Sequence, residues 1–145
     1  MDTTPYQIAK KVREQCEQWN EDNEGYFYSG LSGMCAIASV ALTKTFHEHG
    51  FKDAVFIEGE YIEGKFVHRV KNYLYGLGHC WVELNDKIYD ITATQFNNIK
   101  KEILVVEASN KRYINRTKRD VYRHRFHGWP VDQKPIQNKI KAILK

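Results

Sequence analysis

The sequence predicts an α+β fold with a mostly antiparallel sheet. Two helical patterns come first, strand-forming segments follow, and a third helical pattern ends the chain. Hydrophobic residues recur at helical spacing in the first segment and alternate with polar residues in a central hairpin. A chain of 145 residues is long enough to bury one substantial core, so we expect a single domain over residues 1–145.

The first helix is expected over residues 4–19. Thr4, Pro5 and Gln7 fit an N-cap, a first-turn proline and a capping box. Its apolar residues share one face, and Cys16 lies near that face, so we interpret Cys16 as a core residue. The composition of residues 20–33 predicts a loop.

The second helix is expected over residues 34–49 and is closed by Gly50. Its first three turns are small and apolar, which predicts a central, buried helix. With Ser32 or Gly33 as the N-cap, Cys35 falls in the first turn, where unpaired N–H groups and the helix dipole stabilise a thiolate. This position suits a nucleophile, but taken alone a cysteine here is more often a small apolar residue of a buried helix.

The remaining elements follow from composition and alternation. Residues 63–78 are ambiguous, with a strand followed by a long loop as one interpretation. Strands are expected at 53–61, at 103–108 and once or twice within 111–126, and a C-terminal helix is expected at 134–144.

The hairpin GHCWVELNDKIYDIT, residues 78–92, carries two polar residues where a strand usually has apolar ones. A two-residue loop at Asn85–Asp86 predicts that His79 and Asp90 are diagonal neighbours on one face. The opposite face is expected to be the core face, and we interpret Cys80 on it as a packing residue. Asp90 can then accept the imidazole N–H of His79, fix its tautomer and stabilise its charged form.

Together these residues have the parts of a cysteine-nucleophile triad: Cys35 as nucleophile, His79 as base and Asp90 as the orienting acid. The motifs GMCAIASVAL and GHCWVELNDKIYDITATQF resemble the core of the papain-like and transglutaminase-like superfamily. That pattern is a Cys opening a central helix, then Gly-His-x-Trp-Val-Glu, then Asp-x-Thr on the next strand. The resemblance covers residues 30–96. It implies a helix carrying the Cys packed on an antiparallel sheet carrying His and Asp, and it implies the same three roles for Cys35, His79 and Asp90. The Asp-Ile-Thr-Ala-Thr-Gln-Phe run also resembles small papain-like domains of bacterial toxins and mobile elements.

Papain-like enzymes often carry a Gln before the Cys that helps to bind the oxyanion, and YFYSGLSG contains none. The Cys35 N–H is one expected donor. The second is Tyr28, Ser29 or a backbone group. Trp81 and Gln95 are candidates to line the substrate cleft, with packing on the sheet and a structural turn as the respective alternatives. A zinc site of Cys35, His79, Cys80 and Asp90 is disfavoured because Cys80 points to the other face, so neither a metal nor a cofactor is expected.

The charge is uneven along the chain. Residues 1–64 carry 5 Lys or Arg and 11 Asp or Glu, and residues 65–145 carry 17 and 7. The densest basic run lies within 110–126, and Lys111–Arg125 is a candidate contact for an acidic partner, whereas nucleic acid is a weaker candidate. We favour a solvated strand pair with its aromatic residues pointing inward.

Three cysteines without a CxxC motif indicate free thiols and a cytoplasmic location, and we expect neither a signal peptide nor a membrane span. The sequence therefore predicts a cysteine-dependent amide hydrolase or acyltransferase acting on proteins or peptides. The alternatives are an inactive binding module of the same fold and a nucleic-acid or acidic-protein binder that uses residues 110–126.

Overall fold

The computed structural model describes residues 3–23, 34–62, 77–96, 99–116, 125–126, 129–130 and 134–145. Within these residues the helices are α1 (Pro5–Asp22), α2 (Cys35–Glu48) and α3 (Lys134–Ile143), with a short 3-10 helix, η2 (Ala93–Gln95). The strands are β1 (Val55–Tyr61), β2 (Leu77–Leu84), β3 (Lys87–Asp90), β4 (Leu104–Glu107), β5 (Tyr113–Asn115), β6 (Arg125–Phe126) and β7 (Trp129–Pro130). The α+β prediction is confirmed. The short helix η2 lies in a segment for which no helix was expected.

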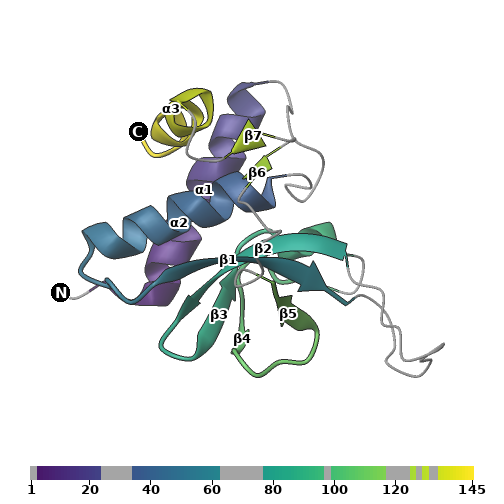
Figure 1. Cartoon of the computed structure of the whole chain (residues 1–145). Helices are drawn as coiled ribbons and strands as arrows, with labels where there is room; N and C mark the ends of the chain where they lie inside the picture. The colour runs from purple at the N-terminus through teal and green to yellow at the C-terminus, as the bar shows by residue number, and fades with distance from the viewer. Residues whose placement is uncertain are drawn as a thin grey trace.

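The main sheet has five strands in the order β4-β3-β2-β1-β5, and every neighbouring pair is antiparallel. Figure 1 shows the three helices together on one side of this sheet, which curls away from them. Strands β6 and β7 pair separately as a two-stranded ribbon. The antiparallel pairing agrees with the prediction from the order of elements.

The helices α1 and α2 differ in how their N-termini are capped. In α1 the Gln7 N–H donates to Thr4 Oγ1 at 3.2 Å and the Thr4 N–H donates to Gln7 Oε1 at 2.9 Å, which confirms the capping box. The N-cap of α2 is Met34, not Ser32 or Gly33 as expected, and its side chain makes no capping bond. Cys35 is therefore the first residue of α2.

The loop between β2 and β3 fixes the register on which the predicted site depends. Asn85 and Asp86 have φ values of 53° and 62°, as both central residues of a type I′ turn require. Leu84 pairs with Lys87 and Val82 pairs with Tyr89. The two-residue loop and its register are confirmed.

Both faces of the sheet are buried, each against its own hydrophobic cluster. The helical-face cluster joins the three helices to the expected core face of the hairpin: Cys80, Val82, Leu84, Tyr89 and Ile91. The concave-face cluster lies on the other side of the sheet and consists of Ile57, Tyr61, Trp81, Ile88, Phe96 and Tyr113. The face that carries His79 and Asp90 is thus a second core, which the sequence interpretation did not foresee because it assigned only one apolar face to the hairpin.

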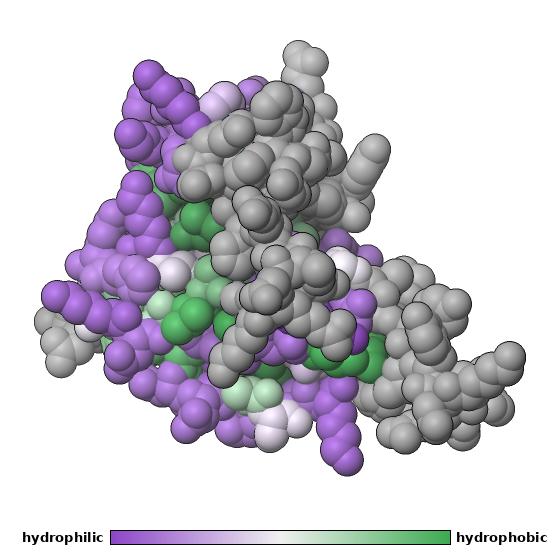
Figure 2. Space-filling model, viewed as in Figure 1, coloured by the Kyte–Doolittle hydropathy of each residue, from purple (hydrophilic) through white to green (hydrophobic). Residues whose placement is uncertain are grey.

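Hydrophilic residues dominate the described surface in Figure 2, and hydrophobic residues show mainly in the band between the helices and the sheet. Across the described residues, no helix combines the length and the hydrophobicity needed to cross a bilayer.

Candidate active site

The pair formed by His79 and Asp90 lies at the end of the β2–β3 hairpin. His79 Nε2 lies 2.7 Å from Asp90 Oδ2, and both side chains are fully buried. Pairing between β2 and β3 ends at Val82 and Tyr89. The side chains of His79 and Asp90 therefore lie just beyond the end of this ladder. The predicted hydrogen bond between His79 and Asp90 is confirmed.

Asp90 accepts two further hydrogen bonds that hold its carboxylate in place. The hydroxyl of Tyr113 donates to Oδ2 at 2.7 Å, and the backbone N–H of Thr92 donates to Oδ1 at 3.1 Å. A buried carboxylate is costly unless it is hydrogen-bonded, and these bonds offset that cost. Asp90 is therefore fixed by groups from β2, from β5 and from the turn that follows β3.

Tyr113 was not recognised as a site residue from the sequence. It lies in β5, which pairs with β1 through Tyr61 opposite Tyr113. The signal available was its place in the basic strand segment, where aromatic residues were expected to point inward. Tyr113 does so, with 8% of its surface exposed, but alternation alone does not identify Asp90 as its partner.

Aromatic rings enclose the imidazole of His79. Phe96 makes an edge-to-face contact at a centroid distance of 4.8 Å, and the Trp81 ring lies at 6.0 Å. Trp81 is fully buried in the concave-face cluster. Trp81 therefore packs on the sheet beside the His79 ring and has no exposed surface.

Cys35 lies at the junction of the two faces. Its side chain is half-buried, packs against the helical-face cluster and hydrogen-bonds with His79 and with Cys80. The backbone N–H of Cys80 also donates to its sulfur. In this register the backbone N–H and C=O groups of residues 80, 82 and 84 point toward β3. The β2–β3 pairing ends at Val82, so the Cys80 N–H points into the gap beyond the ladder, toward Cys35.

The contact with Cys80 corrects the sequence interpretation of that residue. Cys80 is 6% exposed and belongs to the helical-face cluster, as expected, but it is also a direct partner of the candidate nucleophile. Alternation placed the Cys80 side chain on the correct face. It could not show that the first residue of α2 reaches that face at this point.

Electrostatics favour a thiolate at Cys35. The hydrogen bond from Cys80 lowers the pKa of Cys35; burial opposes this, but the hydrogen bond and charge of His79 lower the pKa further, and it lies well below its ordinary value. Burial alone would lower the pKa of His79, but the charge and hydrogen bond of Asp90, together with Cys35, raise it to about 10. A thiolate–imidazolium pair is the expected state at neutral pH.

Gln95 contacts the other ring nitrogen of His79. Its amide Nε2 lies 2.9 Å from His79 Nδ1, and its side chain is half-buried at the end of η2. An amide presents either an N–H or an oxygen, so Gln95 can bond Nδ1 whether or not that nitrogen carries a proton. The turn alternative for Gln95 is true of its backbone, and its side chain also reaches the site.

The remaining predictions concern Tyr28, Ser29 and the basic segment Lys111–Arg125. Tyr28 and Ser29 lie outside the described residues. Within the basic segment Lys111–Arg125, Arg112 donates to the Ile62 carbonyl at 2.7 Å and Arg116 bonds Glu60 at 2.9 Å. These two arginines fasten β5 to β1, and residues 117–124 also lie outside the described part.

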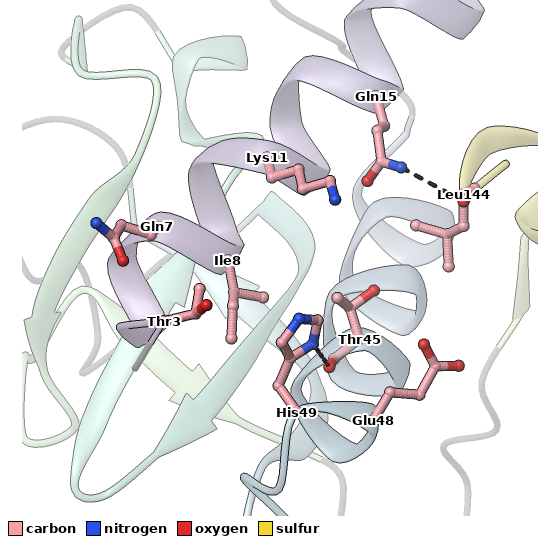
Figure 3. A pocket seen from close by; sticks show the side chains of 9 residues that line it. All are labelled: Thr3, Gln7, Ile8, Lys11, Gln15, Thr45, Glu48, His49 and Leu144. Carbon is pink, nitrogen blue, oxygen red and sulfur yellow. Dashed lines mark hydrogen bonds between the residues drawn. The ribbon is translucent and has the colours of Figure 1, made fainter. Parts of the chain in front are cut away.

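A surface groove opens elsewhere, between α1, α2 and the end of α3 (Figure 3). Lys11, Gln15, Glu48 and His49 line it, and none of Cys35, His79 and Asp90 does. In the parts of the chain that the structure describes, no three His, Cys, Asp or Glu side chains are arranged to hold a metal ion. Comparisons of the chain with protein-family models, with curated proteins and with solved structures found no match.

Proposed function

We propose that this protein is a cysteine-dependent amide hydrolase or acyltransferase of the papain-like or transglutaminase-like type, acting on proteins or peptides. The observation that carries the proposal is the buried contact of 2.7 Å between His79 Nε2 and Asp90 Oδ2, together with the interaction of His79 with the Cys35 thiol, which lowers the pKa of Cys35. Each residue also lies in the environment that its role requires: a half-buried thiol at a helix start, and a buried imidazole and carboxylate behind it.

In the proposed reaction the Cys35 thiolate attacks the amide carbonyl carbon and forms a tetrahedral intermediate. The imidazolium of His79 then gives its Nδ1 proton to the leaving nitrogen, because Nε2 is engaged by the buried Asp90, whereas the Gln95 amide at Nδ1 gives way to the leaving group. Loss of the amine leaves an acyl group on Cys35. Neutral His79 next deprotonates the incoming acceptor, which releases the acyl group and restores the thiolate.

The negative charge on the intermediate requires two hydrogen-bond donors. The first is the backbone N–H of Cys35, since the first four N–H groups of a helix have no partner within it. The second, in this proposal, is the Gln95 amide, which already reaches the His79 ring from the half-exposed side. It supplies the role that a Gln before the Cys has in papain-like enzymes.

The acceptor decides the product. Water at the acyl-enzyme gives peptide cleavage when the leaving group is a main-chain amine and deamidation when it is side-chain ammonia. A primary amine at the same stage gives transamidation.

One incubation distinguishes these outcomes. Glutamine-containing peptides are mixed with the protein and a labelled primary amine, and ammonia, incorporated label and new peptide N-termini are measured together. The intact mass of the protein, quenched in acid, reports an acyl adduct on Cys35. Cys35→Ala is the inactive control, and Cys16→Ala is the matched control because Cys16 is fully buried in α1.

We expect at least one product and an acyl adduct in the wild type and in Cys16→Ala, and neither in Cys35→Ala. The absence of every product and adduct across a broad peptide mixture would overturn the proposed function.

A further inference from the structure

The acyl-transfer chemistry leaves one buried nucleophilic group unused, the thiol of Cys80. It lies in β2 directly after His79 and is 6% exposed. Its sulfur contacts the Cys35 sulfur through a side-chain hydrogen bond. Helix α2 packs directly on β2, and both cysteines adjoin the helical-face cluster, so this contact is held by the core.

We propose that Cys35 and Cys80 form a reversible disulfide that switches the active site off when the protein meets a peroxide. The inference rests on the proposed function in one respect: it requires Cys35 to be a reactive thiolate. Cys35 packs against the cluster that contains Cys80, and its helix packs on β2, so closure to the S–S length of about 2.05 Å needs rearrangement within the site and no new docking of elements.

The chemistry proceeds in two steps. The Cys35 thiolate attacks one oxygen of hydrogen peroxide, the O–O bond breaks, and the products are a sulfenic acid at Cys35 and hydroxide, which takes the His79 proton to become water. The Cys80 sulfur then attacks the Cys35 sulfur and displaces hydroxide, which leaves as a second water with the proton from the Cys80 thiol. Two thiols are oxidised and one peroxide is reduced to two waters.

The environment orders these steps. While Cys35 is a thiolate, three effects raise the pKa of Cys80: the hydrogen bond with Cys35, the burial of Cys80 itself and the negative charge of Cys35. Cys80 therefore stays protonated and does not react first. Conversion of Cys35 to a neutral sulfenic acid removes that charge. His79 has then lost its proton and can relay the Cys80 proton to the departing hydroxide.

Cys16 provides an internal control. It is also a buried thiol, but burial raises its pKa to about 12, and the charged groups that influence it are Arg13 and Glu17 on its own helix. Proximity to a reactive thiolate therefore distinguishes Cys80 from Cys16.

The test begins with fully reduced protein, which is treated with hydrogen peroxide and then alkylated in denaturant. We expect a loss of about 2 Da per chain before alkylation, as two thiol hydrogens leave, labelling at Cys16 alone, and a Cys35–Cys80 linkage in a non-reducing peptide map. A dithiol reductant should restore all three thiols and the iodoacetamide reactivity of the native protein. Cys16→Ala should behave as the wild type.

In Cys80→Ala and Cys80→Ser, no second thiol captures the sulfenic acid. Cys35 should then gain about 32 Da as a sulfinic acid that the dithiol does not reverse. Sulfinic acid at Cys35 of the wild type without the 2 Da loss, or a disulfide through Cys16 or between chains, would overturn the inference. The wild-type mass change needs no variant to fold, and it is measured apart from acyl transfer, so the two proposals can fail separately.

Discussion

At the residue scale, the charge state of Cys35 determines how its reactivity depends on pH. Its pKa lies well below the ordinary thiol value and that of His79 is raised to about 10, so between these two values the site holds a thiolate and an imidazolium. The alkylation rate with iodoacetamide should therefore be on a plateau at pH 7 and should fall only in acid, as the thiolate is protonated.

Removing the imidazole tests the cause of that plateau. His79→Ala loses a hydrogen bond and a charge that lower the pKa of Cys35, so the alkylation profile should shift to higher pH. Once the pKa of Cys35 exceeds 7, each further unit lowers the rate at pH 7 by about ten-fold. Peptide mapping measures the rate at each cysteine, and equal, slow labelling of Cys16, Cys35 and Cys80 would contradict the assignment.

Tyr113 is a positioning residue, because it acts on His79 only through Asp90. Tyr113→Phe removes a 2.7 Å hydrogen bond to a buried carboxylate and keeps the ring that packs edge-to-face on Trp81. Loss of such a bond costs about 1.5–3 kcal/mol of unfolding free energy. Because Asp90 holds the His79 tautomer, the alkylation profile should also change.

The matched control is Tyr89→Phe, which removes a hydroxyl on the helical face of the sheet. Denaturant unfolding and the alkylation profile are measured for both variants. If Tyr113→Phe changes stability but leaves the alkylation profile of the wild type, Tyr113 has a structural role only.

At the element scale, β1 holds the site together by pairing with β2 on one edge and β5 on the other. A Cβ at Gly59 would collide with the Ile114 carbonyl oxygen of β5 and would lie 2.8 Å from the Trp81 ring. The β5 backbone cannot yield without moving Tyr113 away from Asp90. Gly59→Ala should therefore destabilise the fold by about 1–3 kcal/mol, as overpacking does, and also shift the alkylation profile.

Gly78→Ala is the matched control in the neighbouring strand, because a Cβ at Gly78 meets nothing within 4 Å. Thermal unfolding and iodoacetamide alkylation are measured on both variants. A Gly59→Ala protein that is as stable and as reactive as Gly78→Ala would show that β5 does not support the site.

The same scale explains what the sequence could predict. The capping box of α1 and the Asn85–Asp86 turn depend on residues a few positions apart, so both could be predicted from local patterns. The turn fixes the hairpin register, so the His79–Asp90 pair could also be predicted. The Tyr113 bond spans 23 positions and depends on β5 lying beside β1, which no local pattern specifies. The Cys35–Cys80 contact likewise depends on where the start of α2 meets the end of the β2–β3 ladder.

At the scale of the whole molecule, a layer of helices covers one side of the curled sheet (Figure 1). The concave-face cluster packs on the other side. The helical layer anchors α2 and therefore the position of Cys35, whereas His79, Asp90 and Tyr113 depend on the concave face. Stability and site electrostatics should accordingly respond differently to changes in the outer helix, α3.

Ile140 of α3 is fully buried in the helical-face cluster, in a helix that contributes no triad residue. Ile140→Ala should lower the free energy of unfolding by about 2–5 kcal/mol, the usual cost of removing a large aliphatic side chain from a core. The pH profile of Cys35 alkylation should stay that of the wild type under conditions where the variant is folded. Asn138→Ala, on the exposed side of the same helix, should change the free energy of unfolding by no more than about 0.5 kcal/mol. Its alkylation profile should be that of the wild type. Urea unfolding and the alkylation profile are measured on both, and a shifted profile in folded Ile140→Ala would show that α3 helps to set the charge state of the site.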